Sequence, residues 1–549
     1  MPGPGIESFR QRGLSAWRAA ERALDRLAGA AANPLRHLGA VGMLAFWLVT
    51  ASGVVLYIFF ETSVGEAYPS VARMARWPFA AGALLRGLHR YGTDLLVLAT
   101  ALHLLREWLH GHERGFRRFS WLTGTGLIAF VFVAGIGGYW LPWDRLAQYS
   151  ATATAEWLDA LPLVFPTPFA RNFLAAVDDR LFSLFIFVHV GVSLLMLFAL
   201  WFHVQRISRP AAWPARAVAW PMCAVLVVVS LALPVQSAPP AALATVPATL
   251  PFDWIVLFVH PLVDATSPGV VWAAVGAATV VLFGLPFMPT QRRAARSPVA
   301  VVDAGNCNGC KRCLADCPYE AVRMVPHPNQ RIGRTLAVVD ADLCAGCGIC
   351  AGACPSSTPF RSAATLVTGI DMPQLAVGAL RQRLQGALAA CSAPRPLVVF
   401  GCEQGARAAT LAGDDVCSFE LLCAGQLPPS FVEYALRDGA AGVLVAACGE
   451  GGCEFRLGER WTRERLKGLR EPHLRASVEA RRIELAFAGA GDERSLAGAL
   501  QQLRQRVQAL PRPVPEGAPT LTGPVPVPER VQALPPPVAA LPPGRQHHA

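Results

Sequence analysis

The chain has 549 residues and is 53% hydrophobic, so it is too long for one domain and too apolar for an ordinary soluble protein. Its formal net charge of +11 raises the question of nucleic-acid binding, but much of the basic excess borders long apolar stretches. Anionic lipid headgroups are therefore the expected partner, and nucleic acid is not.

Residues 1–36 alternate apolar with basic positions. Phe9 and Trp17 are interleaved with Arg10 and Arg18, and the segment has no uninterrupted apolar core. A signal peptide contains such a core. We therefore predict an amphipathic helix that lies in the membrane interface.

Six apolar stretches follow within residues 37–290, and each approaches or reaches the roughly 20 residues that span a bilayer. They lie near residues 40–60, 90–110, 121–141, 181–205, 217–236 and 268–288. We expect an α-helical transmembrane bundle of six spans.

The loops between these stretches alternate in charge. Arginines gather before the first stretch and after the second, fourth and sixth, whereas the loop between the third and fourth is acidic. Basic loops face the cytoplasm. We expect a multi-pass protein of a bacterial or archaeal cytoplasmic membrane, with both termini in the cytoplasm.

Four histidines lie within the apolar stretches, where an imidazole is costly unless it has a partner. His89 and His103 are fourteen residues apart on the second stretch, and His189 and His203 repeat this interval on the fourth. Fourteen residues return to nearly the same helix face, displaced by roughly 21 Å. Two such helices would make two stacked bis-histidine sites; the alternative is single histidines hydrogen-bonded to a neighbouring helix.

Glycines repeat the same fourteen-residue interval on the first and third stretches. They are Gly39, Gly53, Gly124 and Gly138. A residue without a side chain lets a flat macrocycle approach the backbone, although small residues are also common where membrane helices pack. The shared spacing favours a haem-binding bundle.

On these histidines and glycines, residues 30–290 resemble cytochrome b of the quinol-oxidising respiratory and photosynthetic complexes. The resemblance implies two b-type haems ligated by the histidine pairs, glycines that flank the haems, quinone as substrate, and a homodimer. It also implies that Arg86 and Arg106 lie near haem propionates. The alternative for these arginines is interfacial snorkelling.

The run GYWLPWDRLAQYSATATAEW, residues 138–157, resembles the segment that covers the outer quinol pocket in that family. The family's Pro-Glu-Trp-Tyr motif is represented here by PFDW at residues 251–254. Asp253 is therefore expected in place of the glutamate that accepts a quinol proton. Asp94, five residues after His89, is a second candidate for proton handling, with local hydrogen bonding to the backbone as the alternative.

Fourteen of the fifteen cysteines follow residue 300, in the part expected in the reducing cytoplasm. Metal ligation is more usual there than structural disulfides. Cys223, the cysteine in the membrane part, is expected to be a packed thiol.

Eight cysteines form two runs of the pattern C-x₂-C-x₂-C-x₃-C-P, and they are Cys307, Cys310, Cys313, Cys317, Cys344, Cys347, Cys350 and Cys354. Three cysteines of each run fit one cubane cluster, and the fourth ligates the other cluster in two-cluster ferredoxins. Zinc is the alternative, but the doubled run with its trailing proline is typical of ferredoxins. Residues 300–365 resemble a bacterial two-cluster ferredoxin, an α+β domain. The predicted [4Fe-4S] ligand sets are Cys307, Cys310, Cys313 with Cys354, and Cys344, Cys347, Cys350 with Cys317.

Residues 395–510 alternate short apolar runs with helical stretches, which predicts a small α/β domain. Cysteines follow the expected strands at Cys402, Cys423, Cys448 and Cys453, and four such thiolates can hold one more iron–sulfur cluster. Unligated buried thiols are the alternative, and we assign Cys391 and Cys417 to that class.

The segment 421–455 resembles the delta subunit of methyl-viologen-reducing hydrogenase. This resemblance implies a [2Fe-2S] cluster and electron transfer to a heterodisulfide-reductase-like flavoprotein. One cysteine of the family pattern is missing, because Gly405 stands at its position. Residues 511–549 are Pro-rich and lack apolar periodicity, which predicts a disordered tail.

No Gly-rich dinucleotide fingerprint is present, and the chain carries no evident substrate chemistry of its own beyond quinone. We predict a membrane-bound electron-transfer subunit of a quinone oxidoreductase complex. Its haems would exchange electrons with the quinone pool, and its clusters with a cytoplasmic flavoprotein, hydrogenase, dehydrogenase or heterodisulfide-reductase-like subunit. The alternative is a membrane anchor that docks such a complex without haem-dependent quinone chemistry.

Overall fold

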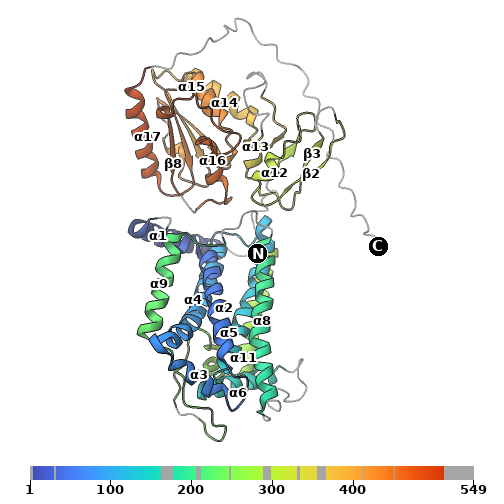
Figure 1. Cartoon of the computed structure of the whole chain (residues 1–549). Coiled ribbons are helices and arrows are strands. Elements are labelled where there is room, and N and C mark those ends of the chain that lie inside the picture. The colour runs from blue at the N-terminus through green and yellow to red at the C-terminus, as the bar shows by residue number, and fades with distance from the viewer. Residues whose placement is uncertain are drawn as a thin grey trace.

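The computed structural model describes residues 4–29, 32–161, 177–205, 212–246, 249–288, 298–330, 334–354, 366–411, 413–449 and 452–511. Figure 1 shows a helical bundle below and a mixed helix and strand region above it. The predicted disordered tail lies outside the described residues, except for Pro511.

The centre of the bundle consists of two packed helix pairs. Helix α2 (Leu38–Phe59) packs against α4 (Ala81–Leu109), and α5 (Arg118–Trp140) packs against α8 (Asp179–Gln205). Helix α9 (Arg216–Ala232) covers the outer side of α4. Phe46 of α2 and Leu127 of α5 belong to one buried apolar cluster, which joins the two pairs.

Among the described residues, four helices are long and apolar enough to cross a membrane. They are α2, α5, α8 and α11 (Pro268–Gly284) together with the 3-10 turn η5 (Leu285–Phe287) that follows it. The other two predicted spans fold as α4 and α9. Helix α4 carries charged side chains such as Arg90 and Asp94, and α9 has 17 residues, fewer than the roughly 20 that a span needs. Six spans therefore stays a prediction.

The amphipathic helix expected near the N-terminus forms as α1 (Pro4–Ala28) and crosses the upper end of the bundle (Figure 1). Glu21 ties it to α4. Its carboxylate accepts hydrogen bonds from Trp17 Nε1 at 2.9 Å and from Arg106 Nε at 3.2 Å. Helix α1 is thus held at the face of the bundle that the upper region covers.

Short helices close the lower end of the bundle. They are α3 (Ala67–Ala75), α6 (Arg145–Asp159) and α10 (Val259–Ala265). Asp144 caps α6 by accepting the Ala147 N–H at 2.9 Å, and its second oxygen accepts the Ala238 N–H at 2.8 Å. One carboxylate therefore fixes the start of α6 against the loop after α9.

The cysteine-rich segment folds into two small antiparallel sheets and two short helices. Strand β1 (Val301–Val302) pairs with β4 (Ile370–Asp371), and β2 (Val322–Pro326) pairs with β3 (Thr335–Val339). The helices are α12 (Arg312–Asp316) and α13 (Ile349–Gly352). Each helix contains the third cysteine of one run, so this cysteine has the same local structure in both runs.

The last region is a parallel four-stranded sheet in the order β6-β5-β7-β8, which confirms the predicted α/β architecture. The strands are β5 (Leu397–Cys402), β6 (Val416–Leu421), β7 (Gly442–Ala447) and β8 (Ile483–Phe487). Strands β5 and β7 are buried along their whole length, as central strands of a parallel sheet are.

Helices cover both faces of this sheet (Figure 1). Val398 and Phe400 pack with α14 (Val377–Ala390) and α15 (Ser430–Arg437) on one face. Leu397 and Val399 pack with α17 (Glu493–Gln508) on the other. Successive strand residues thus point to opposite faces. All four strands run in the same direction, so their carboxyl ends, where the cysteines lie, meet at one edge.

Candidate redox sites

His89 of α4 and His189 of α8 face each other inside the bundle, with ring centres 6.1 Å apart. A metal ion held between two ring nitrogens at bonds of about 2 Å leaves the ring centres about 6 Å apart. His89 Nδ1 lies 3.0 Å from Val49 O, and His189 Nδ1 lies 2.8 Å from Ala134 O. Donation of Nδ1–H to a carbonyl fixes the tautomer in which Nε2 can bind a metal. These residues therefore fit a bis-histidine haem site.

His103 of α4 and His203 of α8 make the second site, each fourteen residues after the first histidine of its helix. His203 Nδ1 lies 3.0 Å from Thr123 Oγ1, and His103 Nδ1 lies 3.8 Å from Glu107 Oε1. The Thr123 hydroxyl is within hydrogen-bond distance of the His203 ring and can orient it, whereas Glu107 is too far from His103 for a hydrogen bond.

The four predicted glycines each stand against one of these imidazoles. A Cβ on Gly53 would lie 2.9 Å from His89 Cε1, and one on Gly138 would lie 2.8 Å from His189 Cε1. The corresponding distances are 3.4 Å for Gly39 to His103 and 2.9 Å for Gly124 to His203. The glycines therefore make room for the edges of the histidine rings. From the sequence we had expected this room to serve a macrocycle or ordinary helix packing.

The two predicted propionate arginines both have protein partners. Arg86 Nη2 donates to Ser237 Oγ at 2.8 Å, and Arg106 is paired with Glu21 of α1. A role of either guanidinium at a haem propionate stays a prediction.

Asp253 and Asp94, the predicted proton-handling residues, converge on Arg90. Arg90 Nη2 lies 2.8 Å from Asp253 Oδ2, and its other terminal nitrogen pairs with Asp94 one helical turn away. Tyr139 donates its hydroxyl to Asp253, whose Oδ1 also accepts the Ile255 N–H at 2.7 Å.

Sequence reasoning missed Arg90 and Tyr139. An arginine inside an apolar stretch and next to a ligand histidine is the signal that could have found Arg90, because such a charge needs a buried acidic partner. The Asp94 carboxylate forms an ion pair with Arg90, and not the local hydrogen bond to the backbone that was the alternative.

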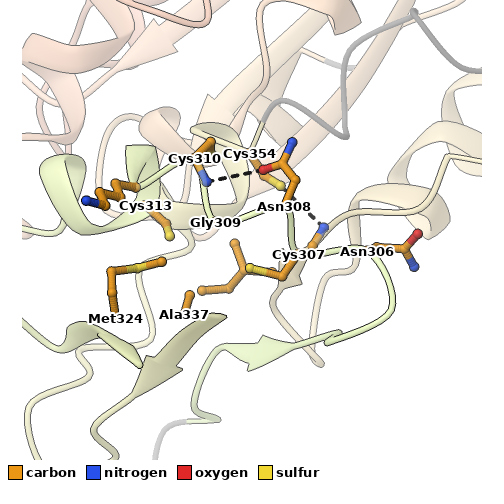
Figure 2. A pocket seen from close by; sticks show the side chains of 12 residues that line it. Asn306, Cys307, Asn308, Gly309, Cys310, Cys313, Met324, Ala337 and Cys354 are labelled. Carbon is orange, nitrogen blue, oxygen red and sulfur yellow. Dashed lines mark hydrogen bonds between the residues drawn. The ribbon is translucent and has the colours of Figure 1, made fainter. Parts of the chain in front are cut away.

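The first ferredoxin set surrounds one pocket. Figure 2 shows Cys307, Cys310, Cys313 and Cys354 around it, and Met324 and Ala337 line its side toward β2 and β3. The space between these residues opens to solvent. Burial and the neighbouring thiols raise the pKa of Cys313 to about 12. The Gly369 N–H donates to Cys354 Sγ at 3.3 Å, a bond of the kind that tunes cluster potentials.

The second ferredoxin set consists of Cys344, Cys347 and Cys350 together with Cys317. Burial, with the Cys317 and Cys344 thiols adding to it, raises the pKa of Cys347 to about 12. Burial and these three thiols also raise the pKa of Cys350. The fourth cysteine of each run thus lies with the other run's triple, which is the exchange expected of a two-cluster ferredoxin.

Four thiols gather at the edge of the parallel sheet. Cys402 Sγ lies 3.3 Å from Cys448 Sγ, and Cys423 and Cys453 complete a ring of neighbouring thiols. A Cβ on Gly458 would lie 2.1 Å from Cys423 Sγ, so α16 (Gly458–Leu466) can begin here only with glycine. This donor set fits one [2Fe-2S] cluster.

Cys391 and Cys417, expected as buried thiols, lie outside this ring and are only partly buried. A Cβ on Gly405 would lie 2.9 Å from Ala488 O, which leaves no room for the missing family cysteine. Cys391 and Cys417 donate to the carbonyls of Asp414 and Ala387, away from the ring. Across the described ranges, no three His, Cys, Asp or Glu side chains converge on a site for a single metal ion.

The ferredoxin-like region packs closely on the sheet region. Cys347 and Cys423 belong to one buried apolar cluster with Trp461, whose Nε1 donates to Asp316 O at 3.1 Å. A Cβ on Gly352 would lie 2.2 Å from Gly425 O. The second ferredoxin set and the sheet-edge set are therefore neighbours.

Family comparisons match three parts of the chain. Residues 25–209 match cytochrome b/b6/petB, residues 306–358 match a 4Fe-4S dicluster domain, and residues 397–511 match the delta subunit of methyl-viologen-reducing hydrogenase. The three resemblances inferred from the sequence are confirmed. The matches support haem and iron–sulfur cofactors and a membrane electron-transfer role.

Individual relatives match the bundle. Cytochrome b6 of Prochlorothrix hollandica is 30% identical over 181 residues, which are 32% of this chain and 81% of that protein. Cytochrome b6 of Stigeoclonium helveticum is 32% identical over 131 residues, and the chain spans only 60% of it. A solved hyperthermophilic respiratory Complex III is 19% identical with a TM-score of 0.39, over 46% of this chain and 74% of that one. Through its N-terminal part the chain belongs to the cytochrome b/b6 family, and the same polypeptide carries a 4Fe-4S dicluster domain and a hydrogenase delta-subunit domain.

Proposed function

We propose that the chain exchanges electrons between the quinone pool and a cytoplasmic redox partner. Two b-type haems, held by His89 with His189 and by His103 with His203, would supply reversible one-electron chemistry within the membrane. The observation that carries this proposal is the 6.1 Å separation of the His89 and His189 ring centres, which would leave room for one metal ion bound by both imidazoles.

The clusters extend this path into the cytoplasm. Two [4Fe-4S] clusters would be held by the two exchanged cysteine sets, and one [2Fe-2S] cluster by Cys402, Cys423, Cys448 and Cys453. The packing of Cys347 beside Cys423 supports direct transfer between these sets. A delta-subunit domain in turn favours a heterodisulfide-reductase-like flavoprotein, hydrogenase or dehydrogenase as the cytoplasmic partner.

In the membrane we propose six spans over residues 37–290, with both termini and the iron–sulfur domains in the cytoplasm. The charge of the loops supports this orientation. The proposed domain limits are 1–36, 37–290, 300–365, 395–510 and 511–549, and the proposed assembly is a homodimer.

At the outer side, Asp253 would accept a proton from quinol. Its carboxylate is buried, and the Arg90 guanidinium 2.8 Å away would fix its position. Tyr139, which donates its hydroxyl to the same carboxylate, would hold it in place.

The test uses the full chain purified anaerobically in detergent. Haem and iron are quantified first, and the haem spectrum is then followed after addition of a reduced bacterial ferredoxin, with and without a soluble quinone analogue. We expect the haems to become reduced; haems that stay oxidised while the clusters are reduced would overturn the proposal. Replacing His103 and His203 by Met separates transfer from anchoring, because unchanged quinone-linked turnover would support an anchor.

A further inference from the structure

The loop between α4 and α5, residues 110–117, forms the contact between the bundle and the sheet-edge cysteines. In Figure 1 this end of the bundle faces the upper region. His112 Nδ1 lies 2.5 Å from Glu107 Oε2 near the end of α4, and its Nε2 lies 3.1 Å from Glu454 Oε1. Glu454 directly follows Cys453 in the chain.

Arg117 binds both sides of the same contact. Its Nη1 lies 3.5 Å from Glu107 Oε2 and also contacts His112, and its Nη2 lies 3.4 Å from Glu454 Oε1 and donates to the Glu454 carbonyl. One guanidinium therefore joins the bundle to the residue beside Cys453.

An aromatic contact lies next to these charges. The rings of Phe116 and Tyr319 have centres 4.4 Å apart, and Tyr319 OH donates to Glu454 O at 3.4 Å. Tyr319 is two residues after Cys317, a member of the second ferredoxin set. The loop thus touches the surroundings of two cluster sites.

The contacts continue to His103, a histidine of the second candidate haem site. Glu107 Oε1 lies 3.8 Å from His103 Nδ1, so a series of contacts no longer than 3.8 Å joins His103 to Glu454 through Glu107 and His112. His112 and Arg117 are largely buried, with side-chain exposures of 9% and 19%. Burying charges costs free energy unless they are paired. We therefore expect the paired charges of His112 and Arg117 to favour one docked geometry of the two regions and to add little to the stability of the fold.

We propose that residues 110–117 are the electron-transfer junction of the chain, at which the haem site of His103 and His203 exchanges electrons directly with the clusters held near Cys453 and Cys317. The inference rests on the proposed function. His112, Phe116 and Arg117 are positioning residues that fix the gap between these carriers. One electron moves in each event: the cluster is oxidised and ferric haem becomes ferrous, with no bond formed or broken.

The test compares Arg117→Ala with Arg475→Ala in the full, cofactor-loaded chain. Arg475, which is half-exposed, pairs with Glu433 of α15 at 3.4 Å, so Arg475→Ala is a control that also removes one ion-paired guanidinium. Haem reduction after mixing with reduced ferredoxin is followed by stopped-flow absorbance. Removing one partner of a buried charge pair weakens a contact at least about tenfold, so we expect at least about tenfold slower haem reduction in Arg117→Ala and no change in Arg475→Ala.

A second pair of variants tests the aromatic contact. Phe116→Leu should slow haem reduction, whereas Tyr319→Phe keeps both rings and should slow it less. Hydrogen exchange of residues 110–117 and 452–457 gives a readout independent of turnover: Arg117→Ala should lose amide protection in both segments together.

The outcomes separate the two proposals. Fast haem reduction in Arg117→Ala and Phe116→Leu, with cofactor content equal to wild type, overturns the junction and leaves the proposed function standing. Wild-type haems that no reduced cluster can reduce overturn the proposed function itself.

Discussion

Arg90 and Asp253 form a buried ion pair with 2.8 Å between Nη2 and Oδ2, one residue along α4 from His89. The pair links the helix that carries the outer histidine to the loop before α10. A candidate proton acceptor is thereby fixed next to a candidate electron carrier, which is the arrangement that quinol oxidation requires.

Asp253→Asn should lower quinol-dependent haem reduction by about 100-fold, because positioned proton acceptors contribute about that much or more. Haem content should be unchanged, since Asn keeps the shape and its Oδ1 can still accept the Ile255 N–H, although the acceptor for Tyr139 is lost. Quinol-driven haem reduction by stopped flow is the measurement. Asp253→Glu is the control and should retain most of the rate; equal rates in Asp253→Asn and wild type would place the acceptor elsewhere.

Gly124→Ala should remove one of two haems. The new Cβ would lie 2.9 Å from His203 Cε1, closer than side chains approach one another, so the imidazole must move. Gly126→Ala is the matched control on the same helix, because nothing lies within 4 Å of its Cβ. The haem-to-protein ratio, measured by haemochrome assay, should fall by half in Gly124→Ala only. If Gly124→Ala and Gly126→Ala both keep two haems, Gly124 is not needed for haem binding.

Gly458→Ala should remove the [2Fe-2S] cluster and spare both [4Fe-4S] clusters. Its Cβ would lie 2.1 Å from Cys423 Sγ, which cannot stay in the ring of thiols. Gly498→Ala on α17 serves for comparison, since its Cβ meets nothing within 4 Å and alanine favours a helix. Electron paramagnetic resonance of the reduced protein distinguishes the cluster types, and an undiminished [2Fe-2S] signal in Gly458→Ala would reject the ligand set.

Much of these sites could be predicted from sequence because local geometry determines it. The fourteen-residue interval places His89 and His103 on one helix face whatever the tertiary packing. The parallel order of β5 and β7 likewise brings Cys402 and Cys448 to one sheet edge, because parallel strands end together. In both cases the pattern follows from a repeat within one element or one sheet.

The contacts between distant segments could not be predicted in this way. Arg117 meets the Glu454 carbonyl across 337 residues, and Tyr139 meets Asp253 across 114 residues. No periodicity or propensity connects such positions, and arginines at a membrane surface are ordinarily explained by lipid. Only the docking of the folded regions shows that Arg117 faces a protein carboxylate.

The junction around His112 should weaken as pH rises. Burial and Arg117 lower the pKa of His112, but its hydrogen bonds to Glu107 and Glu454 outweigh them, so the net shift is upward. A raised folded-state pKa gives stability that is complete below the ordinary value and is lost as pH rises through the raised one. The melting temperature of wild type minus that of His112→Gln should therefore decrease between about pH 5.5 and 8.5.

His110 is the control, because its pKa is shifted in the opposite direction to that of His112. Burial, and then Arg106, lower its pKa, so its contribution is present above the ordinary value and is lost as pH falls through the lowered one. The difference between wild type and His110→Gln should thus increase over the same pH range. If the two variants show the same pH trend, the charged state of His112 does not stabilise the junction.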